Sequence, residues 1–433
     1  MGRTPRDFES RASTNSATRA GAPIVPLDRI EELCSFEHRA AGTDAERDAA
    51  LYLAKALERS GRTAKVEPIR VRPAYSLVFA AHIVLAVVGT ILSVRVPIAG
   101  FVLLLLTGIS LFGDLTARFH IVRMLFPIHS SQNVTSYGTN PRAPERLVLV
   151  AHYDAAYSGL LFNRRFVKPA AQVASKIPFT VGPFFFLFWN VLALLGGALF
   201  RIVGVDSAVL TGTQFLLTVP LLAALPLLID IATSAVVPAA NDNASGVAAV
   251  LELASRLDRR EQARVENIDI WIVFTGAEEG LMLGMRQWLR DHRRELSQKP
   301  TYFINIDSVG YGNPCFVTAE GLAVLFSYDR VLVNLCREIA AVRGSNVATT
   351  PARPLVSRLS HDAIVPQIQG HPAITITCRG KDGLAPTYRL PTDTPNAIEP
   401  EAIEQAIGFC EELVIRLDQK VGAQPTNLLR DGP

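Results

Sequence analysis

One histidine and five acidic side chains stand in short polar strings that follow apolar runs of the sequence. His152 and Asp154 form the first string. The later acids are Asp242, the adjacent pair Glu278 and Glu279, and Asp307. Imidazole and carboxylate groups together are typical ligands of Zn, Mn or Co, and two such metals bridged by a carboxylate are suited to hydrolysis. The residue types therefore indicate metal-assisted hydrolysis.

Buried strands are expected directly before these polar strings. The runs are 147–151 (LVLVA), 268–274 (IDIWIVF) and 302–306 (YFINI). Short continuous apolar runs are typical of parallel strands that are covered on both faces. Ligands of an open α/β sheet bind beyond the carboxyl ends of its strands. The polar side chains are therefore expected to converge at one edge of a sheet.

The remaining elements alternate between strands and helices. Further strands are expected at 64–71, from Asn133 onward and at 373–378, and helices at 46–60, 244–257 and 399–416. This alternation predicts an α/β fold, with a mostly parallel sheet and helices on both faces.

The spacing within each string suggests separate tasks. His152 and Asp154 point the same way in an extended segment, so Asp154 can fix the tautomer of a metal-bound imidazole. The adjacent side chains of Glu278 and Glu279 diverge, so one suits metal binding and the other proton transfer. Each string alone also fits a solvated loop, and Asp242 fits the start of a helix. Their regular order at successive strand ends favours a site.

The order of these strings resembles the cocatalytic zinc aminopeptidases, a metallopeptidase family that also contains glutamate carboxypeptidase and the glutaminyl cyclases. The most specific strings are Asp242-Asn243-Ala244-Ser245-Gly246 and Glu278-Glu279-Gly280. The resemblance covers about residues 130–419, apart from an apolar insertion, with weaker support from 28–72. It implies a zinc exopeptidase-like fold with one or two zinc ions per chain.

The resemblance also implies a role for each residue. His152 and Asp307 would bind one metal, Asp242 would bridge both metals, and Glu279 would bind the second. Glu278 would be the general base, and Asp154 would orient His152.

Arg389 departs from the family pattern, because it stands where the last ligand, a histidine, is expected. An arginine stays protonated and cannot bind a metal. His361 is the nearest substitute ligand, although a hydrogen-bonding or surface role is favoured for it. Arg389 is expected either to neutralise Glu279 or to bind a carboxylate of the substrate.

The excess of hydrophobic residues, 49% against 19% charged, lies in four segments without Asp, Glu, Lys or Arg. They have 22, 18, 24 and 23 residues, between Arg72 and Arg95, Arg95 and Asp114, Lys176 and Arg201, and Asp206 and Asp230. About 20 apolar residues cross a bilayer, so we expect two transmembrane hairpins, with buried core helices as the alternative.

The charges that flank these segments favour a cytoplasmic main domain. Eight basic residues are on the side of the main domain and two, Arg95 and Arg201, on the other. The eight are Arg70, Arg72, Arg118, Arg123, Arg164, Arg165, Lys168 and Lys176. The net charge of +3 is too small for a nucleic-acid binder, and five scattered cysteines without a CxxC pair predict no disulfide framework.

The expected organisation follows from these assignments. Polar tails are expected at 1–22 and 420–433, hairpins at 73–126 and 171–238, and the peptidase domain at 23–72, 127–170 and 239–419. The favoured function is a membrane-bound zinc exopeptidase of the aminopeptidase type that acts on peptides. The alternatives are a single-zinc, cyclase-like or other amide-processing enzyme, and a non-catalytic membrane scaffold. No residue indicates the oligomeric state.

Overall fold

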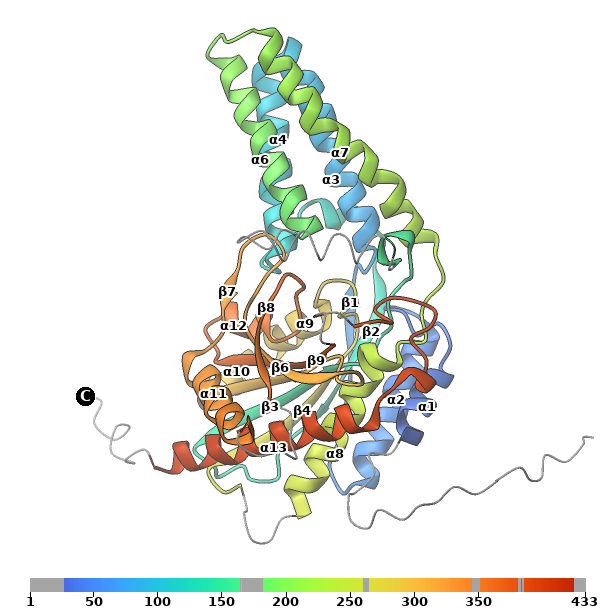
Figure 1. Ribbon diagram of the computed structural model, residues 1–433, viewed down its shortest axis with the longest axis vertical. Coiled ribbons are helices and arrows are strands. Elements are labelled where there is room, and N and C mark those ends of the chain that lie inside the picture. The colour runs from blue at the N-terminus through green and yellow to red at the C-terminus, as the bar shows by residue number, and fades with distance from the viewer. Residues whose placement is uncertain are drawn as a thin grey trace, which may run out of the picture.

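In the part of the chain that the structure describes, an α/β domain carries a long arm of four helices (Figure 1). The computed structural model describes residues 27–163, 165, 182–259, 265–344, 351–380, 383 and 385–423. The expected N-terminal tail, most of the expected C-terminal tail and the start of the second hairpin at 171–181 lie outside the described residues.

Nine strands form one sheet in the order β1-β2-β4-β3-β5-β9-β6-β7, and β8 pairs with β6. Their bounds are β1 Lys65–Val71, β2 His129–Ser136, β3 Glu145–His152, β4 Ile268–Thr275, β5 Thr301–Ile306, β6 Asn313–Glu320, β7 Phe326–Ser327, β8 Arg353–Ser357 and β9 Ala373–Arg379. The four central strands, β4, β3, β5 and β9, are parallel. Antiparallel pairs flank them on both sides.

The central strands are apolar because both faces of the sheet are covered. Every residue of β4 is buried, and β3 is buried from Arg146 onward. The helices of the domain are α1 Leu27–Ser35, α2 Asp44–Arg59, α8 Ser245–Arg259, α9 Leu283–Asp291, α10 Arg293–Leu296, α11 Arg330–Gly344, α12 Ile364–Ile368 and α13 Pro400–Gly422. Helices α8, α11 and α13 pack together on one face, and α9 and α12 lie on the other (Figure 1). The expected α/β class with helices on both faces is confirmed.

The arm consists of the four apolar segments. They form α3 Tyr75–Arg95, α4 Pro97–Leu115, α6 Pro183–Ile202 and α7 Ala208–Thr233, and all four are long and apolar enough to cross a membrane. At 1.5 Å per residue, each is about 30–40 Å long, as a bilayer core requires. The arm has its own apolar core, which also takes in Leu322 and Ala323 from the turn after β6.

The buried guanidinium of Arg39 fixes the strand-end loops to the N-terminal helices. It donates hydrogen bonds to the main-chain oxygens of Leu33, Tyr153, Pro238 and Ala239 at 2.7–3.2 Å. Ala239 has a left-handed backbone with φ 56° and directly precedes the short helical turn η3, Ala240–Ala244. Arg39 thereby holds Tyr153, between His152 and Asp154, and the two residues that precede η3.

Replacing Arg39 with methionine is expected to lower the free energy of unfolding by about 3 kcal/mol. The substitution removes four hydrogen bonds, and the carbonyl oxygens of Tyr153 and Pro238 lose the partner that Arg39 supplies. Thermal unfolding of the detergent-solubilised protein, followed by tryptophan fluorescence, measures the change as a lower Tm. Arg59→Met, at an exposed position of α2, is the matched control. Equal melting temperatures for the two variants would contradict this role of Arg39.

Candidate metal centre

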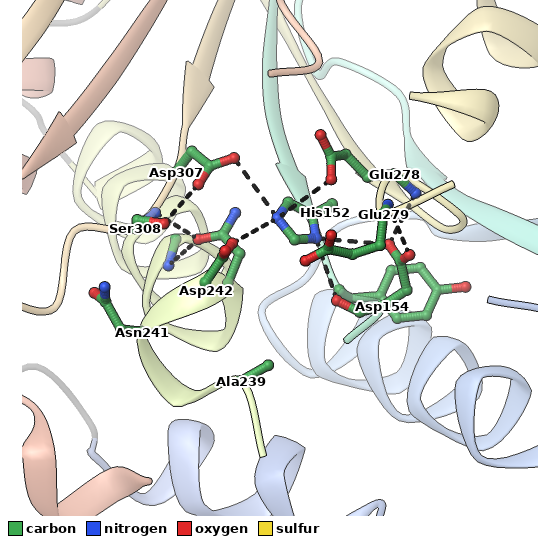
Figure 2. Close-up of polar contacts among 12 residues, drawn as sticks. His152, Asp154, Ala239, Asn241, Asp242, Glu278, Glu279, Asp307 and Ser308 are labelled. Atoms are coloured by element: carbon green, nitrogen blue, oxygen red, sulfur yellow. Dashed lines mark hydrogen bonds and ion pairs between the residues drawn. The ribbon is translucent and has the colours of Figure 1, made fainter. Parts of the chain in front are cut away.

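Three carboxylates surround the Nε2 atom of His152 at the carboxyl ends of the central strands (Figure 2). Oδ1 of Asp242 lies 3.1 Å from Nε2, Oδ2 of Asp307 lies 3.6 Å away, and Oε2 of Glu278 lies 3.9 Å away. His152 ends β3, Asp242 belongs to η3, Asp307 follows β5, and Glu278 follows β4. The structure thus brings these four predicted residues together.

The other imidazole nitrogen of His152 faces Asp154. Nδ1 lies 3.2 Å from the main-chain oxygen of Asp154 and 3.5 Å from its carboxylate Oδ1. When Nδ1 carries the proton and donates toward Asp154, Nε2 is left free as a metal ligand. This is the tautomer that a metal between His152 and the carboxylates needs.

Asp154 also positions the glutamate pair, a role that its spacing in the sequence does not reveal. Its carboxylate accepts the backbone N–H groups of Glu278 at 3.0 Å and Glu279 at 3.1 Å (Figure 2). These two hydrogen bonds fix the loop that carries both glutamates. One residue therefore orients the histidine and the loop of the expected general base.

The cluster is buried and rich in negative charge. The five acidic residues and His152 are each less than a tenth exposed. Burial alone would lower the pKa of His152, but Glu278, Asp154, Asp242 and Asp307 raise it well above its ordinary value. Burial raises the pKa of Glu278 well above its ordinary value, and neighbouring acids add to the rise. A bound divalent cation would relieve this crowding, so the donor set of one imidazole and several carboxylates fits a metal.

A second set of possible metal ligands shares two of these residues, His152 and Asp242. His152, Asp242 and Glu279 each offer a ligand atom, and these atoms lie within 4.8 Å of one another. Glu279, however, is ion-paired through Oε2 with Nη2 of Arg389. A metal at Glu279 would have to displace this guanidinium. The contact matches the expectation that Arg389 neutralises Glu279, and its role in substrate binding stays a prediction.

Aromatic side chains enclose the Arg389 cation. Its guanidinium carbon lies 5.2–5.5 Å from the ring centres of Tyr75, Phe162 and Tyr388, and Nη1 donates to the Tyr75 hydroxyl. Burial alone would lower the pKa of Arg389, but Glu279 and the two tyrosines raise it well above its ordinary value. Tyr75 is the first residue of α3, so the helical arm contributes to the site.

The predicted substitute ligand His361 is engaged elsewhere. Its Nδ1 lies 2.7 Å from Oε2 of Glu320, and its backbone N–H donates to the same carboxylate at 3.0 Å. His361 is not in the three-residue group of possible metal ligands found among the described residues. This geometry supports the hydrogen-bonding role over the ligand role, which stays a prediction. The next residue, Asp362, accepts from the hydroxyl of Thr275.

Two acids that position the site were not predicted from the sequence. Asp393 accepts the backbone N–H groups of Asn241 at 3.0 Å and Asp242 at 3.2 Å. Glu46, in the first turn of α2, accepts the N–H of Ala277 at 3.0 Å. Asp393 lies in the polar string Thr392-Asp393-Thr394, four residues after Arg389. Glu46 has no local signal, because its partner is 231 residues away.

Asn243 joins the loop of Asp242 to the end of β5. Its side-chain oxygen accepts the N–H groups of Gly246 and Ser308, both at 3.0 Å, and its amide nitrogen donates to Ile306. The peptide bond between Asp242 and Asn243 is cis. Ser308, like Ala277 on the neighbouring loop, has a left-handed backbone, which is unfavourable for a residue with a side chain. Hydrogen bonds to Asn243 and Glu46 hold these two strained residues in place.

Comparison with known proteins supports the family resemblance. Residues 229–414 match the sequence model of Peptidase family M28. This segment contains Asp242, the glutamate pair, Asp307 and Arg389. No curated protein matches the chain in sequence. The resemblance that was drawn from the order of the motifs is confirmed for this segment.

Solved structures share the fold at low sequence identity. A glutaminyl cyclase from Bacteroides thetaiotaomicron, solved with N-acetylhistamine, has a TM-score of 0.51 and 15% identity over 91% of this chain and 99% of that chain. A leucine aminopeptidase precursor from Bacteroides thetaiotaomicron has a TM-score of 0.50 and 15% identity over 91% of this chain and 98% of that chain. A Zn-dependent exopeptidase from Parabacteroides distasonis has a TM-score of 0.50 and 15% identity over 91% of this chain and 99% of that chain. At this identity the likeness establishes the fold.

Substitution of Asp154 by asparagine is expected to weaken metal binding by about 10- to 100-fold, because the residue holds His152 and the glutamate loop together. The asparagine amide would place a donor against two N–H groups that the carboxylate now accepts. Titration of the metal-free protein with zinc and a competing chelator measures the affinity. Asp291→Asn, an exposed change of the same kind in α9, is the control. Unchanged affinity in Asp154→Asn would refute the positioning role.

Proposed function

We propose that this chain, whose residues 229–414 match the sequence model of Peptidase family M28, is a membrane-bound zinc hydrolase that cleaves peptide bonds at the N-terminus of its substrates. The observation that carries the proposal is the convergence of Asp242, Glu278 and Asp307 on Nε2 of His152. Buried acids packed this closely would be strongly unfavourable without a cation.

His152, Asp242 and Asp307 are the residues that would hold the zinc ion. Their side chains supply one imidazole nitrogen and two carboxylates, and catalytic zinc sites commonly use three protein ligands of these kinds. When bound, zinc polarises the scissile carbonyl group and makes water a better nucleophile near neutral pH.

Glu278 is the group that moves the proton. Asp154 fixes its backbone, and its carboxylate faces the same point as His152. Burial and neighbouring acids raise its pKa, which makes the carboxylate a stronger base than an exposed glutamate. We assign it the task of taking a proton from the attacking water and delivering it to the leaving amine.

The ion pair between Arg389 and Glu279 favours a site that holds one metal ion rather than two. The guanidinium of Arg389 already neutralises Glu279, which would otherwise bind a second metal. The side chains of Arg389 and Glu279 are 13% and 7% exposed, and three aromatic rings lie around the guanidinium, so breaking the ion pair would leave an unpaired charge in a largely dry environment. The same ion pair favours the second candidate function, a single-zinc enzyme that processes another amide. Profiling of peptides with free and blocked N-termini separates the two candidates.

The exposed surface of the arm supports insertion into a membrane. Large apolar residues of α3, α4 and α7 are exposed in the isolated chain, with Ile91 at 64%, Ile98 at 68%, Val209 at 78% and Phe215 at 71%. A soluble protein rarely exposes so large an apolar surface, whereas lipid tails would cover it.

The distribution of basic residues supports a cytoplasmic main domain. Arg70, Arg72, Arg118 and Arg123 lie at the domain end of the first hairpin, while Arg201 at the far end is buried and hydrogen-bonded to Gln214. Three of the eight flanking residues, Arg164, Lys168 and Lys176, lie outside the described residues. This asymmetry follows the positive-inside rule.

Replacing Glu278 with glutamine is expected to reduce kcat for peptide hydrolysis by about 10²- to 10⁴-fold, because glutamine cannot accept the proton. The zinc content of the variant should equal that of the wild type, since Glu278 is not assigned as a ligand. Hydrolysis of unblocked peptides and elemental mass spectrometry give the two readings. Glu58→Gln, at an exposed position of α2, serves as the control. Wild-type turnover in Glu278→Gln would exclude the mechanism.

The wild-type chain is expected to bind one zinc ion, and Arg389→His is expected to bind two. Histidine would free Glu279 and supply the ligand that Arg389 replaces. Arg389→Lys, which keeps a cation beside Glu279, should still bind one. Elemental mass spectrometry of protein that was saturated with zinc and then desalted measures the three values. Two zinc ions in the wild type would show that Glu279 binds metal despite the ion pair.

A further inference from the structure

A basic cavity of about 150 Å³ lies where the first hairpin of the arm meets the α/β domain. Arg70 and Arg72 line it from the segment before α3, His120 and Arg123 from the segment after α4, and Arg286 and Arg290 from α9. None of the described residues that line the cavity is acidic. Three separate parts of the chain therefore bring positive charge to one place.

The positive charge of the cavity is far from neutralised within the chain. Asp114 accepts from Nε of Arg123 and from His120, both at 2.7 Å. The other contacts are to neutral groups or carbonyl oxygens: Arg72 donates to Phe126, and Arg286 contacts His120 and donates to Arg118. Among the described residues, no ion pair joins Arg70, Arg72, Arg286 or Arg290 to an acid. Within the part of the chain that the structure describes, Asp114 is thus the only acid that forms an ion pair with one of the five arginines of the cavity.

Arg123 is held in position and still has unused hydrogen-bonding capacity. It is 1% exposed, and its Nη1 donates to the main-chain oxygens of Arg72 at 2.8 Å and Gly280 at 3.0 Å. Its Nη2 is buried and has no hydrogen-bond partner. A buried donor without a partner is costly, and Arg123 is one of the residues that line the cavity. Gly280 follows Glu279, so this wall of the cavity is bonded to the loop of the candidate site.

Crowding of like charges affects Arg286 in particular. Burial lowers its pKa to about 10, and the neighbouring charges of Arg290 and Arg123 add to the effect. An anion in the cavity would favour the charged form of Arg286 and so raise its pKa again. The guanidinium fork also matches the oxygen atoms of a phosphate group, to which arginine binds through two parallel hydrogen bonds.

The position of the cavity points to a lipid as the source of that phosphate. The segment between α4 and β2, which carries His120 and Arg123, also exposes Ile121 at 48%, Met124 at 63% and Leu125 at 82%. A short segment with exposed apolar side chains beside arginines is typical of chain that lies in the headgroup region of a bilayer. A headgroup in this region would reach the cavity without leaving the membrane.

The positive-inside rule, which sets the orientation of the protein in the membrane, does not explain why these arginines converge on one cavity. Basic residues that set the orientation need only lie near the ends of a span. Arg286 and Arg290 instead come from α9, more than 150 residues after the first hairpin, and Arg123 is buried. Their convergence on a single cavity is a feature of the tertiary fold.

We propose that this cavity binds the phosphate headgroup of an anionic phospholipid. The volume, equal to that of about five water molecules at ~30 Å³ each, admits a phosphate group with part of its hydration shell. The ligand is assigned as a lipid phosphate rather than a free phosphate because of the apolar segment beside the cavity. Basic pockets beside membrane helices are known to bind anionic headgroups.

The test uses the full chain in a mild neutral detergent and dioctanoyl phosphatidylglycerol as the probe, with binding followed by calorimetric titration. Dioctanoyl phosphatidylcholine and inorganic phosphate are titrated in parallel. The double variant Arg286→Gln/Arg290→Gln removes two charges from the wall of the cavity. Arg293→Gln/Arg294→Gln removes the same charge from exposed positions of α10, away from the cavity, and is the matched control.

Wild type and control are expected to bind phosphatidylglycerol at least tenfold more tightly than the double variant, and far more tightly than phosphatidylcholine. Inorganic phosphate is expected to bind more weakly than phosphatidylglycerol, because it lacks the acyl chains that contact the apolar segment. Equal affinities of the double variant and the wild type for phosphatidylglycerol would overturn the proposal. Inorganic phosphate that binds as tightly as the lipid would show that the cavity is a site for free phosphate. Unchanged thermal unfolding of the double variant would confirm that its fold is intact.

Discussion

The acidic residues at the carboxyl ends of β3, β4 and β5 are buried side by side, and burial of like charges is costly unless each carboxylate meets a cation or an N–H donor. The surrounding structure supplies these partners unequally. Asp154 accepts two backbone N–H groups, and Glu279 has Arg389. Asp242, Asp307 and Glu278 face His152, and Asp307 also accepts from the Ser308 hydroxyl at 2.9 Å, so the remaining negative charge is concentrated at the point where a metal would be held.

The need to fix these carboxylates also explains the polar residues behind them. Each strand-end loop is held by a side chain from a distant part of the chain: the loop after β4 by Glu46, η3 by Asp393, and the residue after Asp307 by Asn243 of η3. Such contacts keep left-handed residues such as Ala277 in conformations that a free loop would leave. The site is therefore rigid because its supports come from several elements that fold together.

The apolar pattern predicted what depends on local sequence. The runs before His152 and Asp307 are central strands because continuous apolar residues require cover on both faces of the sheet, and the four charge-free segments are long helices. Strands β6, β7 and β8 were not predicted: β7 has only two residues, β8 is mostly exposed, and the apolar run of β6 is only Cys315-Phe316-Val317. The partners of Asp393 and Glu46 were also missed, because contacts across 150 residues or more leave no periodic signal.

The helical arm contacts Arg389, the residue at the position where the sequence led us to expect a histidine ligand. Arg389 can replace a metal ligand only if its charge is satisfied, and one of its partners, Tyr75, is the first residue of α3. Arg123, which follows the first hairpin, donates to Gly280 directly after the glutamate pair. The hairpin thus contacts the loop of the candidate base at one end and the cation beside Glu279 at the other. An insertion that served only as an anchor would need neither contact, so the arm is part of the architecture of the site.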